Sequence, residues 1–545
     1  MLIQIYQVFS VVKELALSTL RNSFSKKKSK GNKTKYVHTS SYLWHLEKDK
    51  DKFRELQDQF APFVQNIFGV TEKTFRDGCY NGTIFRFPLR AAYMKSNISD
   101  TEYDIQKVHA LFDSLETESH LMLLFLKNLE CIEVYENMSE RTSPSHLMTV
   151  KVSSSTETIV QNSRQKLLNE IIARDKVSFS VTYPMSTELS KQSSPLNSRD
   201  WVISQFCGGL DEMMMISEIS DTLRLLPWVG VALPVQPSSS TVSLRLERFD
   251  KPQGHIFCFL PLPLESESPT GLKFHVHGYF AMDSNRRHLK WETPDQNVDT
   301  LKDKDIIWNR FLVAHLLPKA LVNLSNFVTK DNDRAIQIAP ENVYALIPNE
   351  NKIKAPHWLP LAHAFLSKLP KLEIFYSKIS GGKYLQIKNA LFDNEDDKSK
   401  QSEVIRSVLL QDKKALVSVP TFVFEQLGLD AQSINPSLVC SSLKNVQQLM
   451  TLSDDERMTL LNYFLKKLNE ISFEQLIGAR LLPLADGSWI EFKSAAQAEE
   501  QEKIYVDTGD HQRSLLPGVE KRFLMSKVQE DLLSEVRELA QRSKF

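Results

Sequence analysis

Apolar and polar residues follow each other along this chain with two periods, which predict a mixture of strands and helices. Alternation of every second residue is typical of strands, whereas apolar spacings of three and four residues are typical of helices. Strands are predicted at residues 84–87, 131–135, 177–183, 201–207, 227–234, 255–260, 274–280 and 372–376, with two more in 479–492. Helices are predicted at residues 104–129, 165–174, 306–324, 361–369, 404–410, 456–468, 473–477 and 525–542. The pattern indicates an α+β protein.

Three stretches interrupt this pattern. Residues 116–119 are expected to break the helix at 104–129 before the apolar run that follows. Residues 186–199 are polar and contain Pro195, so they are predicted to be a linker, and residues 393–400 are predicted to be a charged loop.

The N-terminus combines an apolar stripe with a lysine-rich run. The stripe predicts an amphipathic helix with Leu2, Ile5, Val8, Phe9, Val12 and Leu15 on one face. Six lysines within residues 26–35 predict a solvated linker, with a nuclear signal or a patch for anionic surfaces as the alternative. No segment is expected to reach the roughly 20 apolar residues of a membrane span.

The charge balance and the contents of glycine and cysteine narrow the classes of function. Lys plus Arg and Asp plus Glu both number 67, which argues against a general binder of nucleic acids. Only 17 of the 545 residues are glycine, so few places remain for a loop that cradles phosphates. Five cysteines without a C-x-x-C pair predict free thiols in a reducing compartment, and therefore a cytoplasmic protein.

Motifs for nucleotide binding and for hydrolysis lack their required spacing. The sequence has no P-loop, no G-x-G-x-x-G after a strand and no G-x-S-x-G elbow. The nearest match to a P-loop, ISGGKY at residues 379–384, predicts a hairpin turn instead.

Four histidines are the best candidates for a metal site. His275 and His277 alternate on a predicted strand, so they share one face, and His255 and His288 are near in sequence. Zinc requires three or four ligands, and the nearest carboxylates do not fall at a ligand spacing. We interpret the four as structural histidines and predict no metal.

Two further groups have both a functional and a structural interpretation. Cys207 precedes two glycines and is a candidate nucleophile, but no partner residues surround it in sequence, so a buried thiol is favoured. Arg286 and Arg287 are able to bind a phosphate or a carboxylate through their guanidinium groups. A solvated surface or a structural ion pair is the favoured alternative for both.

Four separate strings resemble repeats of the sacsin family, in the order and spacing of that family. The first, residues 58–90, ends in the pattern G-T-x-F-R-x-P-x-R, formed by Gly82, Thr83, Phe85, Arg86, Pro88 and Arg90. The second, residues 254–291, contains the family positions His275, Gly278, Phe280, Arg286, Arg287 and Trp291. The third, residues 481–492, contains Asp486 and Gly487, and residues 513–524 resemble the piece that follows it.

This resemblance implies a chaperone-related protein. Sacsin repeats begin with an ATPase-like domain of the GHKL type, shared with the ninety-kilodalton heat-shock chaperones, and continue into a region like a chaperone middle domain. By resemblance, an N-terminal segment of residues 1–45 precedes the remnant C-terminal part of a GHKL-type α/β sandwich in residues 46–195. Mixed α/β domains like a chaperone middle region then occupy residues 196–330 and 331–545.

The sequence departs from the family at the catalytic end. GHKL ATPases use an early helix with Glu and Asn and a D-x-G-x-G turn, and neither is found before residue 58. Only Gly82 and Thr83 match a motif on the nucleotide side. We therefore expect a chain truncated at its nucleotide-binding end that is not an enzyme and has no cofactor, with ATP and magnesium relevant only if an upstream half exists.

Three functions are consistent with this sequence. The favoured one is a non-catalytic chaperone-like or co-chaperone-like protein that acts through protein–protein interaction. The alternatives are an ATP-dependent chaperone whose nucleotide-binding half is missing from the given gene sequence, and a pure scaffold. The expected partners are client proteins or other chaperones, without nucleic acid and without a membrane span.

Overall fold

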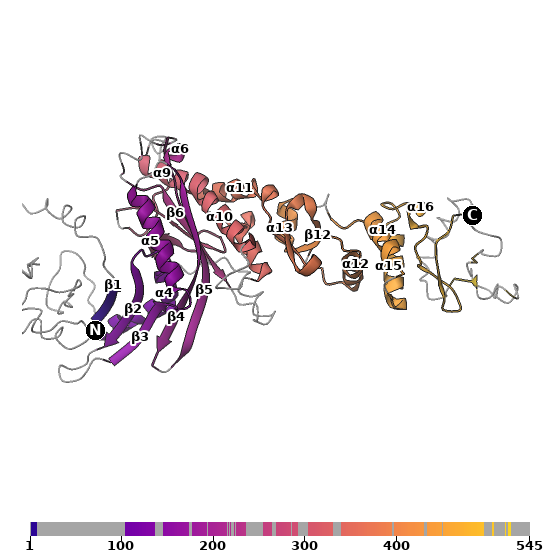
Figure 1. Ribbon diagram of the computed structural model, residues 1–545, viewed down its shortest axis with the longest axis horizontal. Coiled ribbons are helices and arrows are strands. Elements are labelled where there is room, and N and C mark those ends of the chain that lie inside the picture. Colours follow the sequence, from indigo (N-terminus) through magenta and orange to yellow (C-terminus); the bar gives the residue numbers. More distant parts are fainter. Residues whose placement is uncertain are drawn as a thin grey trace, which may run out of the picture. The chain divides into compact units, whose positions relative to one another are not determined.

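The computed structural model describes an N-terminal strand, most of residues 104–235 and most of residues 254–494 (Figure 1). The main described ranges are 2–7, 104–136, 145–173, 177–192, 194–214, 225–235, 254–263, 269–292, 303–330 and 339–494, with short gaps. The predicted strand at 84–87, the helix at 525–542, the lysine-rich run and the motif at 58–90 lie outside the described residues.

The chain divides into two compact units. Unit 1 comprises Met1–Leu324, Asp331–Ala339 and Ile353–Leu361. Unit 2 comprises Ser325–Lys330, Pro340–Lys352 and Ala362–Phe545. The four domains expected from the sequence stay a prediction.

Within its described residues, unit 1 is built around one nine-stranded sheet. The strand order is β1-β2-β3-β4-β5-β6-β9-β7-β8, and all neighbours are antiparallel except β7 and β9. The strands are β1 Leu2–Gln7, β2 Leu129–Glu136, β3 Ser145–Val152, β4 Phe179–Lys191, β5 Ser194–Cys207, β6 Trp228–Val235, β7 Ile256–Cys258, β8 Leu260–Pro261 and β9 His275–Gly278. With the helices below, this sheet agrees with the α+β prediction.

Burial along the strands follows the apolar pattern. In β2, Ile132 and Val134 are buried between half-buried neighbours, as the predicted alternation at 131–135 requires. Residues 201–206 of β5 are buried without a break, as expected for a strand covered on both faces in the middle of a sheet. The predicted strands at 177–183, 201–207, 227–234 and 274–280 are confirmed with shifted ends.

Two helices run alongside the strands of unit 1 and contact β4 (Figure 1). Helix α4, Ile105–Met122, begins where the Asp104 carboxylate accepts a hydrogen bond from the Lys107 backbone at 2.8 Å. Helix α5, Glu157–Ala173, carries the buried Arg164. The Arg164 guanidinium donates to the Leu123 and Leu129 carbonyls at 2.6 and 3.0 Å, which satisfies carbonyls beyond the end of α4.

A long helical segment begins at Lys304. It consists of α9 Lys304–Phe311, the π-helical turn η2 Leu312–Leu316 and α10 Leu317–Lys330, whose last six residues belong to unit 2. Pro318 lacks a backbone N–H and is disfavoured inside an α-helix, and the π turn comes directly before it.

This helical segment also corrects one prediction. Lys304–Lys330 is long and apolar enough to cross a membrane, so the expectation that no segment reaches that length was wrong. In the structure 61% of its most apolar window is buried, as in the core helix of a folded protein. The length and composition of this segment therefore do not by themselves identify a membrane-spanning helix.

Unit 2 combines short helices with small sheets. Its described 3-10 turns are η3 Pro340–Leu346, η4 Glu350–Lys352, η6 Leu369–Lys371, η7 Ile379–Gly381 and η8 Ile387–Asn389. Its described helices are α12 Lys400–Gln411, α13 Thr421–Gln426, α14 Pro436–Val446, α15 Asp454–Lys466 and α16 Phe473–Leu476. Helix α11, Leu359–Leu366, precedes them and contains the boundary between the two units. Its strands pair as β10 Phe375–Ser377 with β11 Lys383–Leu385, β12 Leu391–Asn394 with β13 Leu416–Val419, and β14 Leu482–Pro483 with β15 Trp489–Ile490. A core of α12, α14 and α15 side chains holds part of it together.

The predicted linker at 186–199 was wrong, because these residues form the outer part of the β4–β5 hairpin. The two strands pair from Phe179 and Cys207 to Lys191 and Ser194. Their polar side chains make hydrogen bonds, such as Ser186 Oγ to Asp200 at 2.7 Å. The β5 half of this segment, residues 194–199, is exposed, whereas Ser186, Thr187 and Leu189 of β4 are buried.

Two helix predictions also differ from the structure. Residues 2–7, predicted as the start of an amphipathic helix, form β1, which pairs antiparallel with β2. The β-branched Ile3 and Ile5 alternate with glutamines, which suits a strand. Helix α4 does not break at 116–119 but continues to Met122, and the Ser119 hydroxyl within it donates to the Glu116 carbonyl at 2.8 Å.

Candidate functional site

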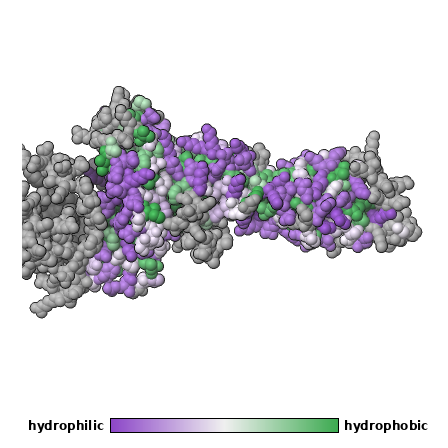
Figure 2. Space-filling view, viewed as in Figure 1, coloured by the Kyte–Doolittle hydropathy of each residue, from purple (hydrophilic) through white to green (hydrophobic). Residues whose placement is uncertain are grey.

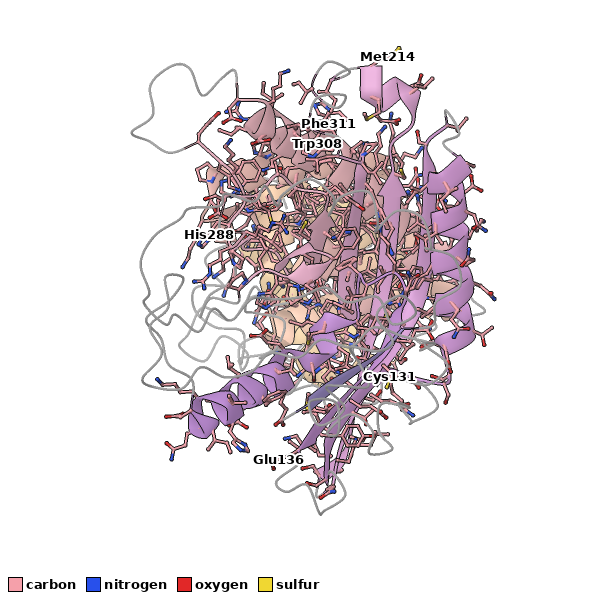
Figure 3. The ribbon with its side chains drawn as sticks, turned by 90° about the vertical axis from the view of Figure 1, so that its left-hand side faces the viewer. Cys131, Glu136, Met214, His288, Trp308 and Phe311 are labelled. Atoms are coloured by element: carbon pink, nitrogen blue, oxygen red, sulfur yellow. The ribbon has the colours of Figure 1, made fainter. Side chains whose placement is uncertain are left out.

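Residues 254–291 fold into β7, β8, β9 and a tight turn. Met282 pairs with Leu289, and between them Asp283 accepts hydrogen bonds from the backbone amides of Arg287 and His288 at 3.0 and 3.4 Å. Arg286, Arg287 and His288 are exposed on this turn, and His288 lies at the edge of the molecule in Figure 3. The carboxylate of Asp283 thus shapes the turn that presents the two arginines.

Two glycines of this block, Gly254 and Gly278, leave no room for a larger side chain. A Cβ on Gly254 would lie 2.4 Å from the Phe274 carbonyl oxygen, a contact that only a backbone shift would relieve. A Cβ on Gly278 would meet the ring of Phe280 at 2.9 Å. Phe280 is itself buried and packs edge-on against Trp358.

His275 and His277 are buried on β9 and connect it to β7. The His255 backbone amide donates to His275 Nδ1 at 3.1 Å. His277 Nδ1 lies 3.3 Å from both the Phe259 amide nitrogen and the Phe257 carbonyl oxygen, so its role depends on the tautomer. Burial lowers the pKa of each imidazole to about 3, so both are neutral at pH 7.

This geometry gives the four histidines different surroundings. His255 stacks on His275 with ring centroids 5.3 Å apart, His277 stacks on Phe125, and His288 is exposed on its turn. Among the described residues no group of three or more His, Cys, Asp or Glu side chains is placed to hold a metal. The hydrogen bonds to β7 give His275 and His277 the structural role that the sequence predicted.

Lys127 occupies a cage of three aromatic rings that the sequence analysis missed. Its ammonium lies 4.6 Å from the Trp228 ring centroid, 4.7 Å from Phe259 and 5.4 Å from Tyr279, and it donates to the Tyr279 hydroxyl at 3.0 Å. Burial lowers the pKa of Lys127. The rings come from β6, the β7–β8 corner and the end of β9, so sequence spacing carries no signal for the cage.

Cys207 ends β5 beside Glu212 of α6, Leu210–Met214. Burial, followed by the charge of Glu212, raises the pKa of this thiol to about 11, so it is protonated at pH 7 and a weak nucleophile. Burial favours a raised pKa for Glu212, but hydrogen bonds from Lys319, Ser178 and the Gly209 amide outweigh it and lower the pKa to about 2. The four described cysteines are free thiols, as predicted.

A pocket of about 310 Å³ lies at this end of the sheet, lined mainly by apolar residues from α5, β4, β5, α6 and the start of β6. Val177 and Leu210 line it and are 78% and 46% exposed. Ile172 and Met214, each next in sequence to a lining residue, are 74% and 71% exposed. We call this pocket with Ile172, Val177, Leu210 and Met214 the strand-end surface.

The pictures agree with this concentration of apolar groups. Figure 2 shows hydrophobic residues around α6, at the top of the view. Figure 3 shows Met214 at the top of the view, above the buried Phe311 and Trp308. Exposed apolar groups that gather at one place mark interaction sites more often than scattered ones do.

The remaining predicted positions belong to unit 2. Asp486 and Gly487 form the turn of the β14–β15 hairpin, where Asp486 accepts from the Ser488 amide at 3.0 Å and Gly487 has a φ of 85°. Residues 379–382 form the turn between β10 and β11, so the hairpin predicted in place of a P-loop is confirmed. These residues shape turns rather than a common site with residues 254–291.

Comparison with known proteins decides the family. The Sacsin domain family matches residues 32–149. Human Sacsin is 30% identical over 525 residues, which is 92% of this chain and 11% of the human protein. The chain belongs to the sacsin family. No solved structure matches it.

Only part of the Sacsin domain match lies within the residues that the structure describes. Residues 32–149 of the Sacsin domain match include α4 and β2, which are described. They also include the predicted remnant of nucleotide binding, Gly82 and Thr83, and the family positions Phe85, Arg86, Pro88 and Arg90, all of which lie outside the described residues. The chain spans about a tenth of the length of human Sacsin.

Proposed function

We propose that this sacsin-family chain is a non-catalytic, chaperone-like protein that binds exposed apolar segments of other proteins. The observation that carries the proposal is the strand-end surface, where the exposed Val177 and Leu210 line an apolar pocket and two further exposed apolar residues, Ile172 and Met214, are next in sequence to lining residues. Burial of such side chains against a partner releases about 25 cal/mol for each Å² removed from water. An unfolded client supplies the matching apolar segments.

The same proposal includes the assignment of a GHKL-type fold and a cytoplasmic location for this chain. Residues 46–195 are the C-terminal remnant of a GHKL-type sandwich, and the following regions resemble a chaperone middle domain. Family membership supports this assignment. The protein acts in the cytoplasm on client proteins or with other chaperones, which the free thiols of the described cysteines support.

We also propose that the chain does not hydrolyse ATP. The sequence contains no D-x-G-x-G turn. The segment most similar to a P-loop, residues 379–384, folds as the β10–β11 hairpin turn. A ligand that binds only the folded state raises its melting temperature. Addition of Mg-ATP is therefore expected to leave the melting temperature of the purified chain unchanged, whereas a rise of several degrees would favour the ATP-dependent alternative.

Client binding is tested by the suppression of aggregation. We expect the full chain to reduce the light scattering of a heat-denatured model enzyme, and the variant Val177→Glu/Met214→Glu to lose most of that effect, because two carboxylates would oppose apolar contact. Leu196→Glu is the matched control, since Leu196 is 60% exposed near the turn of the β4–β5 hairpin, at the other end of β5 from Cys207.

Two results would contradict the proposal. The first is an equal loss of suppression in the Leu196→Glu control and in the double variant. The second is a wild-type chain that captures partners in pull-downs but suppresses no aggregation, which would favour the scaffold alternative.

A further inference from the structure

A second pocket, of about 220 Å³, lies within unit 1 beside the turn of the two arginines. Its wall is formed mainly by residues of the block 254–291 together with the 3-10 turn η5, Pro356–Trp358. We call it the motif pocket and define it by Pro263, Pro269, Arg287, His288, Trp291 and His357. It is distinct from the strand-end surface and shares no lining residue with it.

One side of the motif pocket is apolar and flat. The Trp291 indole and the His357 imidazole stack with centroids 4.3 Å apart and planes 17° apart. Burial lowers the pKa of His357 to about 4, so this ring is neutral at pH 7 and forms an aromatic wall with the indole. Two prolines and Leu262 continue the apolar lining.

Another side of the motif pocket is cationic. Arg287 lines it, is exposed, and its guanidinium makes no ion pair or hydrogen bond with the described residues. Among the described lining residues there is no carboxylate, and the nearby Asp283 is engaged by the backbone amides of its own turn. The polar groups of the pocket therefore favour an anionic ligand.

The volume of the motif pocket limits the size of that ligand. It is smaller than the roughly 300–1,000 Å³ of pockets that hold drug-sized molecules. A single residue with an apolar side chain and a free carboxylate is small enough for this volume. It contacts the aromatic wall with its side chain and Arg287 with its carboxylate. The last residue of a polypeptide has both groups on one Cα atom.

We propose that the motif pocket binds the C-terminal carboxylate of a partner polypeptide that ends in an apolar residue. The guanidinium of Arg287 pairs with the carboxylate, and Trp291, His357 and the two prolines contact the last side chain. Guanidinium and carboxylate match in a bidentate geometry, which fixes the orientation of the chain end. This site is independent of the binding of unfolded clients at the strand-end surface.

The test uses the full chain and a fluorescein-labelled hexapeptide, Gly-Ser-Gly-Ser-Ala-Leu, with a free C-terminal carboxylate. Fluorescence anisotropy should show saturable binding, and the same peptide with a C-terminal amide should bind about 10- to 100-fold more weakly, as expected for the loss of one charged hydrogen-bonded pair. A peptide that ends in glycine should also bind more weakly, because it leaves the aromatic wall uncovered.

Adjacent arginines supply the matched variants. Arg287→Gln should weaken the binding of the acid peptide to the level of the amide, whereas Arg286→Gln should leave it unchanged, because Arg286 does not line the pocket. Both side chains are exposed, so both variants should keep the wild-type melting temperature.

Three results would overturn the proposal. They are equal affinities for acid and amide peptides, equal effects of the two arginine variants, and the absence of saturable binding up to millimolar peptide. Tighter binding of an amidated peptide with an internal phosphoserine would also overturn it, since the pocket would then recognise phosphate.

Discussion

Lys127 follows α4 in the sequence, and its ammonium lies over rings that belong to residues 228, 259 and 279. The side chain connects the α4–β2 loop to three later parts of the sheet. A cation over desolvated rings contributes up to about 2 kcal/mol. The aromatic cage therefore stabilises a connection between segments that are far apart in sequence.

We predict that Lys127→Met lowers the free energy of unfolding by about 1–2 kcal/mol, because the variant keeps an apolar stem but loses the cation–π contacts and the hydrogen bond to Tyr279. The midpoint of urea unfolding, followed by tryptophan fluorescence, measures the change. Lys166→Met is the control, since Lys166 is exposed and lies 5.5 Å from a single ring, Phe179. A midpoint equally shifted in both variants would contradict this role for the cage.

The motif residues illustrate the limits of sequence at this scale. The exposed pair Arg286 and Arg287 was recognised as a candidate for anions, but the sequence does not distinguish them. The backbone of Arg286 has a φ of 54°, and only Arg287 lines the motif pocket. The difference arises from the turn geometry that Asp283 imposes.

At the scale of elements, helix α15 of unit 2 begins with a capping box. The Ser453 hydroxyl accepts from the Glu456 amide, and the Glu456 carboxylate accepts from the Ser453 amide at 2.8 Å. This reciprocal capping box satisfies two backbone donors at the start of α15. Hydrogen bonds from Ser453 lower the pKa of Glu456, so the box favours the ionised carboxylate.

We predict that Ser453→Ala destabilises the chain by about 1 kcal/mol, the usual cost of removing an N-cap hydroxyl. Hydrogen exchange of the first turn of α15, followed by mass spectrometry, should accelerate. The control is Ser441→Ala within α14, whose exposed hydroxyl bonds only to a carbonyl of its own helix and caps nothing. Unchanged exchange in α15 of the Ser453 variant would show that the box does not hold this helix end.

The β4–β5 hairpin shows where element prediction failed. Residues 186–199 carry no apolar alternation, because β4 buries the polar Ser186 and Thr187 and the paired β5 residues 194–199 are exposed. Pairing continues there because the backbone hydrogen bonds extend from the buried part of the same strands. A strand that runs beyond the core cannot be recognised by hydrophobic period.

At the scale of the whole molecule, buried histidines are concentrated in unit 1. Burial lowers the pKa of His275 and His277 to about 3 and of His120 and His357 to about 4. In the described part of unit 2 the histidine is His363, which is exposed. The two units should therefore differ in their response to acid.

We predict that unit 1 loses stability as the pH falls from about 6.5 toward 4, whereas unit 2 changes little. The unfolded chain binds protons on these histidines near pH 6.5, but the folded chain does not until near its lowered pKa values. Each such histidine contributes a slope of up to about 1.4 kcal/mol per pH unit. Urea unfolding at pH 7.5 and pH 5.5, probed by brief proteolysis and peptide mass spectrometry, would separate the units.

Two glutamine variants test the origin of this acid response. His277→Gln should reduce the pH dependence of unit 1 even if it lowers the overall stability, because one depressed imidazole is removed. His363→Gln should leave that dependence unchanged. A slope in unit 1 that is the same for wild type and His277→Gln would assign the acid response to other groups.

Local chemistry is readable from sequence where neighbours in the chain decide the outcome. The strand at 131–135, the hairpin turn at residues 379–382 and the two strands within residues 479–492 depend on residues a few positions apart, and the structure agrees with them. The four separated motifs likewise identified the sacsin family, because their order is a property of the chain. Such features need no knowledge of the fold.

The Lys127 cage, the neutral histidines, the strand-end surface and the motif pocket depend on the tertiary structure. Each combines residues from elements that are distant in sequence, such as Trp291 and His357 or Lys127 and Tyr279. Their contacts and pKa values arise from burial and from the order of the strands in the sheet. The same hydrophobic pattern is compatible with many topologies, so it does not determine these contacts. Folding selects one arrangement because it buries the apolar faces together while most of the buried polar groups find partners.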